Sequence, residues 1–166
     1  MKHYNSEKSK ISNYITPEGE KALRNELNHL WKNERPKITA IVHEAAKNGD
    51  RSENGDYIYG KKRLREIDKK VSFISKRLKQ LIIVSENPTN KNKIYFGAWV
   101  SVSYENGDIK KYRIVGPDEF DLNENKISID SPLAKALIGK EVNDTILFKT
   151  PTSYQEVSIK SINYEP

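Results

Sequence analysis

The stretch Asn48-Gly49-Asp50-Arg51-Ser52-Glu53-Asn54 decides how the first half of the chain folds, because it is a polar turn between two segments with helical periodicity. Two carboxylates, Asp50 and Glu53, lie within it. One interpretation makes Asp50 the N-cap of the second helix and Glu53 its N3 partner, a capping box that pairs free backbone N–H groups. The other interpretation makes the two carboxylates oxygen ligands for a divalent metal, presented at the end of a rod.

The apolar residues on either side of the turn predict an antiparallel helical hairpin. They recur mostly at spacings of three and four: Leu23, Leu27, Leu30, Ile38, Ile41 and Ala45 before the turn, and Leu64, Ile67, Val71, Ile74, Leu78 and Leu81 after it. In an antiparallel pair the numbers of facing residues have a constant sum. Leu27 with Ile74 gives 101, and Ile38 with Leu64 gives 102, so the midpoint falls inside the polar turn.

The first helix is expected to begin at Pro17, with Thr16 as its hydroxyl cap, and to run to Asn48. The acid of a complete capping box is missing, because the third residue after Thr16 is Gly19. Pro36 interrupts the apolar pattern and is expected to kink this helix rather than end it. A helix of this span is about 48 Å long at roughly 1.5 Å per residue.

The second half of the chain predicts a small sheet domain. Residues 85–93 are rich in Ser, Asn, Pro and Thr and indicate a linker, after which the periodicity changes to two. The expected elements are strands at 99–104, 109–115, 127–129, 145–149 and 157–162, with a helix at 132–138. We therefore predict an α+β protein with four parts: a disordered lead-in (1–14), an antiparallel two-helix coiled coil (15–84), the linker (85–93) and an antiparallel sheet domain with a short helix (94–166).

Charge is concentrated in the first half of the chain. The net charge of the chain is +6, and residues 61–80 contain nine Lys and Arg residues against two acidic ones, a balance of +7. Such a stripe is typical of proteins that bind nucleic acid or another polyanion, although the solvated outer face of a coiled coil gives the same pattern. The chain has no cysteine, no apolar run of membrane-spanning length and no signal-like apolar core in residues 1–14, so we expect a cytoplasmic protein.

Nothing in the sequence indicates a self-contained active site. The histidines, His3, His29 and His43, lie near no nucleophile or metal-binding cluster, and no glycine-rich phosphate loop is present. Two carboxylates alone bind Mg²⁺ weakly, because this ion retains its waters and normally shares ligands with a substrate. The pattern therefore favours a rod that completes the active site of another macromolecule while its basic face holds nucleic acid.

Several motifs resemble those of the bacterial Gre transcript cleavage factors, over about residues 15–165. The resemblance depends on Gly49-Asp50-Arg51-Ser52-Glu53-Asn54 with Asp56-Tyr57, on Lys61-Lys62-Arg63-Leu64-Arg65-Glu66-Ile67-Asp68, on Phe96-Gly97-Ala98-Trp99-Val100, and on Ile127-Ser128-Ile129-Asp130-Ser131-Pro132-Leu133-Ala134. The second and third stretches, with Leu30-Trp31 and Glu34-Arg35-Pro36, are more similar to the GreB branch than to GreA. Gly55 departs from the alanine usual in the family, and the lead-in is longer.

The resemblance implies a coiled coil that enters the secondary channel of RNA polymerase and an FKBP-like domain that docks at the channel rim. It implies that the protein is not itself an enzyme, and that a monomer stimulates the polymerase's own cleavage of backtracked RNA at its 3′ end. Asp50 and Glu53 match the acids that help to hold Mg²⁺, an ion held mainly by the polymerase and not by the isolated protein. The other matched positions are Lys61, Lys62, Arg65 and Lys69 for RNA, and Ser128, Asp130 and Pro132 for polymerase docking.

Two alternatives remain open at this stage. The chain can be a non-catalytic coiled-coil adaptor or a channel-blocking regulator of RNA polymerase, whose tip acids serve only as helix caps. At the docking positions, Ser131 or Asp130 before Pro132 can simply cap the short helix. Prolyl isomerisation by the sheet domain has only the expected fold in its favour, and a fold alone does not supply an active site.

Overall fold

The computed structural model describes residues 10–49 and 51–165 of this α+β protein. It divides into two compact units: one is formed by Glu20–Leu81, and the other by the segments that precede and follow it. Within the described ranges no helix is long and apolar enough to cross a membrane.

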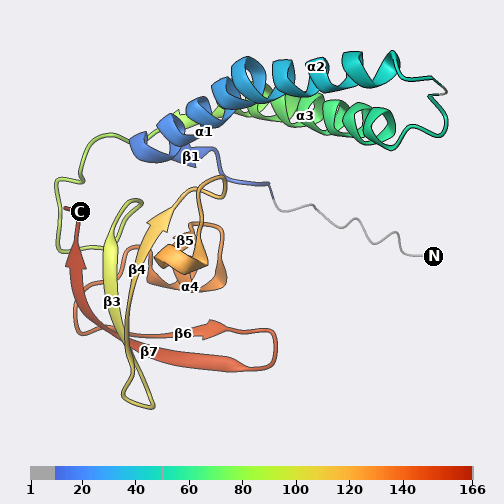
Figure 1. The fold of residues 1–166 in the computed structure, drawn as a ribbon. Helices are drawn as coiled ribbons and strands as arrows, with labels where there is room; N and C mark the ends of the chain where they lie inside the picture. Colours follow the sequence, from blue (N-terminus) through green and yellow to red (C-terminus); the bar gives the residue numbers. More distant parts are fainter. Residues whose placement is uncertain (1–9, 50, 166) are drawn as a thin grey trace, which may run out of the picture. The chain divides into compact units, whose positions relative to one another are not determined.

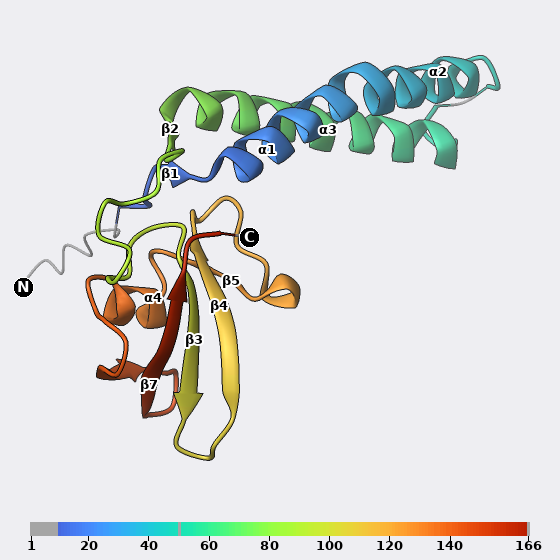
Figure 2. The same cartoon turned by 90° about the vertical axis from the view of Figure 1, so that its left-hand side faces the viewer.

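The first unit contains most of an antiparallel helical hairpin, as the sequence predicts. Its elements are α1 (Pro17–His29), the π-helix η1 (Leu30–Glu34), α2 (Arg35–Ala46) and α3 (Gly55–Gln80). Figures 1 and 2 show α1 and α2 lying along α3 in the opposite direction. Leu30, Ile67 and Ile74 are buried between the helices, and the residues packed against them are Leu23, Leu27, Ile38, Val71 and Leu78. Ile41 differs from the prediction, because 43% of its surface is exposed.

The interruption before Pro36 is a π-helix, with α-helix on both sides. The N–H of Arg35 donates to the carbonyl of Leu30, five residues back instead of four. Pro36 has no N–H, and its ring would clash with the carbonyl four residues earlier in a regular α-helix, so a wider turn accommodates it. The π-helix also explains why the numbers of facing residues in the two arms add up to 101 at Leu30 but to 102 at Ile38. A wider turn takes up one extra residue in the first arm, so the sum rises by one.

The second unit contains a five-stranded sheet in the order β5-β4-β3-β7-β6. The strands are β3 (Trp99–Tyr104), β4 (Ile109–Val115), β5 (Lys126–Ser128), β6 (Thr145–Lys149) and β7 (Tyr154–Asn163). Their pairing is antiparallel except that β4 and β5 are parallel, which corrects the prediction of a wholly antiparallel sheet. The reason is the connection between them, residues 116–125 with the 3₁₀-helix η2 (Leu122–Glu124), which carries the chain back to the end where β4 began.

A short helix, α4 (Pro132–Leu137), completes the core of this unit (Figure 1). Its buried residues Leu133, Ala134 and Leu137 belong to the same apolar cluster as Val100 and Ile159 of the central strands. The expected hairpin unit and sheet unit with one short helix are therefore confirmed, although β7 is longer than the predicted strand.

The end of the predicted lead-in is ordered, which is a correction for residues 10–14. The two-residue strand β1 (Tyr14–Ile15) pairs in parallel with β2 (Ile82–Ile83), and Ile15 is fully buried. In addition, the backbone N–H of Ser12 donates to Oδ2 of Asp130 at 3.0 Å. A buried apolar side chain and paired backbone groups hold this segment in place, whereas residues 1–9 lie outside the described ranges.

Candidate functional site

Asn54 organises the turn between α2 and α3. It is the N-cap of α3, and its Oδ1 accepts from the N–H of Tyr57 at 3.1 Å. Its Nδ2 donates to the carbonyl of Ala45 at 2.8 Å, so one side chain pairs with the backbone of both helices. Gly49 supplies the reversal with φ of +103°, a conformation that favours glycine.

This cap overturns the predicted capping box of Asp50 and Glu53. Because α3 begins at Gly55, Glu53 precedes the N-cap and is an exposed turn residue rather than N3. Gly55 occupies the first helical position, so the cost of an interior glycine does not apply to it. Asp50 itself lies outside the described residues.

Glu53 has the chemistry of a metal ligand but does not form a complete site. Its carboxylate is exposed and, among the parts of the chain that the structure describes, it makes no ion pair or hydrogen bond. Carboxylate oxygens suit Mg²⁺, which requires about six ligands and retains several waters. Within residues 10–49 and 51–165, no group of three or more His, Cys, Asp or Glu side chains could hold a metal ion. A metal bound at Glu53 therefore needs ligands from elsewhere.

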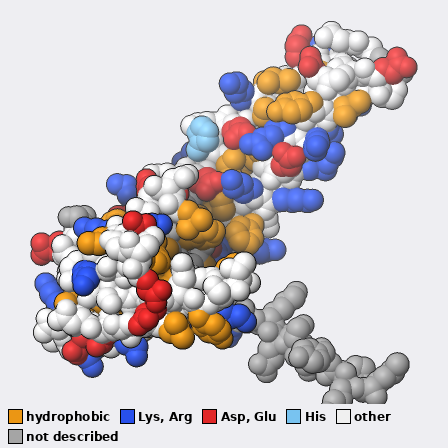
Figure 3. Space-filling view, turned by 90° about the horizontal axis from the view of Figure 1, so that it is seen from below, with side chains coloured by type: hydrophobic (Ala, Val, Ile, Leu, Met, Phe, Trp, Pro, Cys, Tyr) orange, Lys and Arg blue, Asp and Glu red, His pale blue; other side chains and the backbone are white. Residues whose placement is uncertain are grey.

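Six of the nine basic residues of α3 form two sets. One set pairs with acids: Arg63 with Glu34 and Glu66, and Lys70 with Glu26. The other set, which we call the basic face, is exposed and has no ion pair with any described residue: it consists of Lys61, Lys62, Arg65 and Lys69. These four are the residues for which the family resemblance implies contact with RNA. Figure 3 shows one side of the protein, where basic and hydrophobic side chains are both exposed on the hairpin.

Arg35 and Arg63 join the two arms of the hairpin from the two sides of its seam. Hydrogen bonding to Asp68 raises the pKa of Arg35, and hydrogen bonding to Glu34 and Glu66 raises the pKa of Arg63. Both guanidinium groups therefore stay charged and are paired with neighbouring carboxylates. The basic face differs in that its charges remain available to a polyanion.

The predicted docking residues lie together where β5 leads into α4. Ser128 Oγ accepts from the N–H of Asp130 at 3.1 Å, and Asp130 accepts from Ser12 as described above. Ser131 is the N-cap of α4, with Oγ accepting from the N–H of Ala134 at 3.3 Å, and Pro132 follows it as an exposed first residue. Asp130 therefore does not cap the helix, and its hydrogen bond to Ser12 was not visible in the sequence.

Sequence comparisons identify relatives that match both units. The family model "Transcription elongation factor, N-terminal" matches residues 13–83, and "Transcription elongation factor, GreA/GreB, C-term" matches residues 88–164. Transcription elongation factor GreB of Pseudomonas aeruginosa is 51% identical over 100% of this chain and 99% of its own length. GreB of Haemophilus influenzae is 54% identical over 93% and 98% of the two chains, and GreB of Yersinia pestis is 54% identical over 93% and 91%.

The crystal structure of GreA factor homolog 1 from Thermus thermophilus aligns over 90% of this chain and 97% of its own, at 22% identity and a TM-score of 0.41. The assignment rests on the sequence relatives, which are about half identical over nearly the full length of both chains. The chain belongs to the GreA/GreB family of transcription elongation factors and is similar to its GreB members.

Proposed function

We propose that this protein is a transcript cleavage factor for RNA polymerase. The turn at residues 47–54 enters the secondary channel, and the polymerase then cleaves backtracked RNA at its own active centre faster than it does alone. The observation that carries the proposal is that Asn54 caps α3, so the exposed carboxylate of Glu53 is not needed for the helix. The hydrolytic centre belongs to the polymerase, and the factor is not an enzyme by itself.

In this proposal Glu53 and Asp50 contribute oxygen ligands to Mg²⁺ that the polymerase already holds in part. When bound there, Mg²⁺ supplies charge stabilisation and a more acidic water for phosphodiester hydrolysis. The protein's own contribution is to present carboxylates at a narrow turn whose backbone is fixed by Asn54. The isolated protein is not expected to bind the ion with appreciable affinity, because the described residues bring too few candidate ligands together.

The basic face and the docking residues, which lie outside the turn, contact the other parts of the complex. The basic face holds the phosphates of the extruded RNA, because its four cations have no acidic partner among the described residues. Ser128, Asp130 and Pro132 contact the rim of the channel, with Pro132 exposed and Asp130 held by Ser12. A single copy of the chain is sufficient for these roles.

The test replaces Asp50 by Asn and Glu53 by Gln, singly and together, and measures RNA cleavage in a stalled, backtracked elongation complex with Mg²⁺. Each change keeps the size of the side chain and removes its negative charge, so we expect stimulated cleavage to fall by about tenfold or more. Binding to the polymerase should be nearly unchanged.

The matched control is Glu44→Gln, an exposed acid near the end of α2 that pairs only with Lys47 among the described residues. We expect this variant to stimulate cleavage like the wild type. Full activity of the Asp50 and Glu53 variants would rule out the proposed mechanism, and the protein would then be a channel-blocking regulator or an adaptor.

A further inference from the structure

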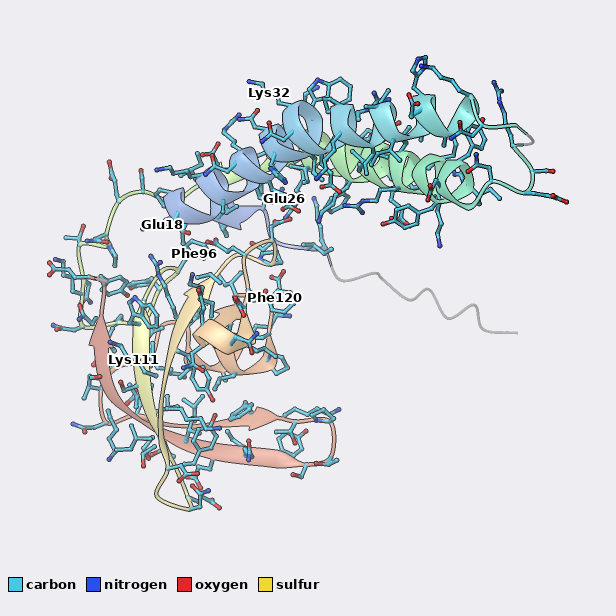
Figure 4. The ribbon with its side chains drawn as sticks, in the orientation of Figure 1. Glu18, Glu26, Lys32, Phe96, Lys111 and Phe120 are labelled. Carbon is cyan, nitrogen blue, oxygen red and sulfur yellow. The ribbon has the colours of Figure 1, made fainter. Side chains whose placement is uncertain are left out.

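Trp31 and Arg35 form an exposed surface on the first arm of the hairpin, which we call the aromatic shelf. This surface has no role in the function proposed above. Trp31, Arg35 and Pro36 line an open cavity of about 600 Å³ with Thr39, Ala40 and His43 of the next turns. The Trp31 side chain is 53% exposed, although a large apolar ring is normally placed in contact with other apolar groups. Lys32, the next residue, points away from α3 (Figure 4).

The Trp31 ring is held in position by its neighbours. The guanidinium carbon of Arg35 lies 5.2 Å from the centroid of the ring, within the range of a cation–π interaction. Arg35 is fixed in turn by Asp68, with Nε 2.8 Å from Oδ1 of the carboxylate. The guanidinium lies over the ring while about half of the residue stays open to solvent, so the indole presents a flat surface whose orientation is favoured by Arg35.

The contact between Arg35 and Asp68 places the shelf beside the basic face. Arg65 lies three residues before Asp68 and Lys61 seven residues before it, so both are on the side of α3 that Arg35 contacts. Lys61 and Asp68 are about 10 Å apart along the helix axis at roughly 1.5 Å per residue. An aromatic surface therefore lies at the same edge of the hairpin as a row of cations that have no acidic partner among the described residues.

We infer that Trp31 is a stacking platform for a base of single-stranded RNA whose phosphates are held by the basic face. Aromatic rings beside a row of basic side chains bind single-stranded nucleic acids in this way, because every base has a flat face that can stack and every nucleotide carries a phosphate. The choice of RNA rests on the proposed function. The alternative occupant, a polypeptide surface of the polymerase, is excluded or supported by the experiment below.

The test compares wild-type protein with Trp31→Ala and Trp31→Phe, using a labelled single-stranded RNA oligonucleotide and inorganic polyphosphate as separate probes. We expect Trp31→Ala to weaken RNA binding about fivefold, the lower end of what base stacking contributes, and to leave polyphosphate binding unchanged. Trp31→Phe should retain most of the affinity because its ring can still stack. Tyr154→Ala, which removes an aromatic that is 63% exposed in the other unit, should bind both probes like the wild type.

A second measurement uses the fluorescence of Trp31 itself. The chain has two tryptophans, so Trp99→Phe leaves Trp31 as the sole source of indole fluorescence. RNA should then quench this signal, whereas polyphosphate should not. No quenching, with RNA affinity unchanged in Trp31→Ala, would overturn the inference, and weaker binding of Trp31→Ala to polymerase alone would assign the shelf to a protein contact instead. These assays require no cleavage, so they fail or succeed independently of the variants at Asp50 and Glu53.

Discussion

Asn54 shows how one side chain can hold two helices at a turn. Its amide accepts from the N–H of Tyr57 and donates to the carbonyl of Ala45, so both functions depend on the same rotamer. The four possible cap residues within the turn, Asn48, Asp50, Ser52 and Asn54, are nearly equivalent in propensity. The rule that places an acid three residues after the cap favoured Asp50, because Glu53 stands three residues after it. The structure selects Asn54 instead, because α2 ends where the carbonyl of Ala45 can accept a hydrogen bond from the Asn54 side chain.

The first prediction concerns the stability of the hairpin. Asn54→Ala removes the cap and the link to Ala45, and we expect the free energy of unfolding to fall by about 1–2 kcal/mol. Asn54→Asp keeps the acceptor for Tyr57 but loses the Nδ2 donor, so its loss should be smaller. Urea unfolding followed by circular dichroism measures both changes.

The control for this prediction is Asn48→Ala in the same turn. Asn48 is exposed, and its backbone N–H, which the substitution keeps, donates to the Ala45 carbonyl, so the substitution should change stability by less than about 0.5 kcal/mol. If the Asn54→Ala variant were as stable as the Asn48→Ala variant, the Asn54 cap would contribute nothing to the stability of the hairpin. That result would contradict the conclusion that α3 does not need the carboxylate of Glu53.

The missing half of the capping box of α1 is supplied by a loop that is far away in the sequence. Thr16 caps α1, with Oγ1 accepting from the N–H of Gly19 at 3.1 Å. The acid that usually stands at the third position is provided by Glu119, which accepts from the backbone N–H of Thr16 at 2.8 Å and from the N–H of Gly116 at 3.0 Å. A Cβ at residue 19 would lie 2.2 Å from Oε1 of Glu119, so the glycine makes room for this carboxylate.

The second prediction follows from this arrangement. Thr16 is 2% exposed, so Glu119→Ala leaves buried donors of Thr16 and Gly116 without an acceptor, and the free energy of unfolding should fall by roughly 2–4 kcal/mol. Glu119→Gln keeps one oxygen and should lose less. Amide hydrogen exchange at Thr16 and Gly116 should accelerate in Glu119→Ala.

A matched control is Glu124→Ala. Glu124 lies on the same connection between β4 and β5, but it is exposed and pairs only with Lys126 among the described residues. We expect its stability to change by less than about 0.5 kcal/mol. Unchanged exchange at Thr16 in Glu119→Ala would show that the loop does not cap α1.

The elements that the sequence predicted are those with strong local periodicity. The bounds of β3, β4 and β6 agree with the structure because alternating apolar and polar residues specify each strand locally. The pair Asn106-Gly107, a common hairpin turn, also fixes the connection between β3 and β4. The parallel pair of β1 and β2 was missed because each strand has two residues and its partner is far away in the chain. Glu119 was missed for the same reason, since nothing near it in the sequence indicates a helix that begins more than one hundred residues earlier.

Charge is divided unequally between the two halves of the chain. Residues 1–88 carry a balance of +7 and residues 89–166 a balance of −1, and the basic face lies entirely in the first half. The sequence identified the stripe but could not show which of its cations are neutralised. Cross-hairpin pairs such as Arg63 with Glu34 depend on the register of the two arms, so the structure was needed to separate them from the basic face.

The last prediction tests whether this division governs binding to RNA. The variant with Gln at Lys61, Lys62, Arg65 and Lys69 removes four positive charges. The slope of log affinity against log salt is negative, and each lost phosphate contact reduces its magnitude by about 0.7 for a single strand. We therefore expect the magnitude of the slope to decrease by up to about 3, with weaker binding at low salt. A control with Gln at Lys91, Lys110, Lys135 and Lys140 removes the same charge from the sheet unit and should leave the slope close to that of the wild type. Equal effects of the two variants would mean that net charge, rather than the basic face, attracts the RNA.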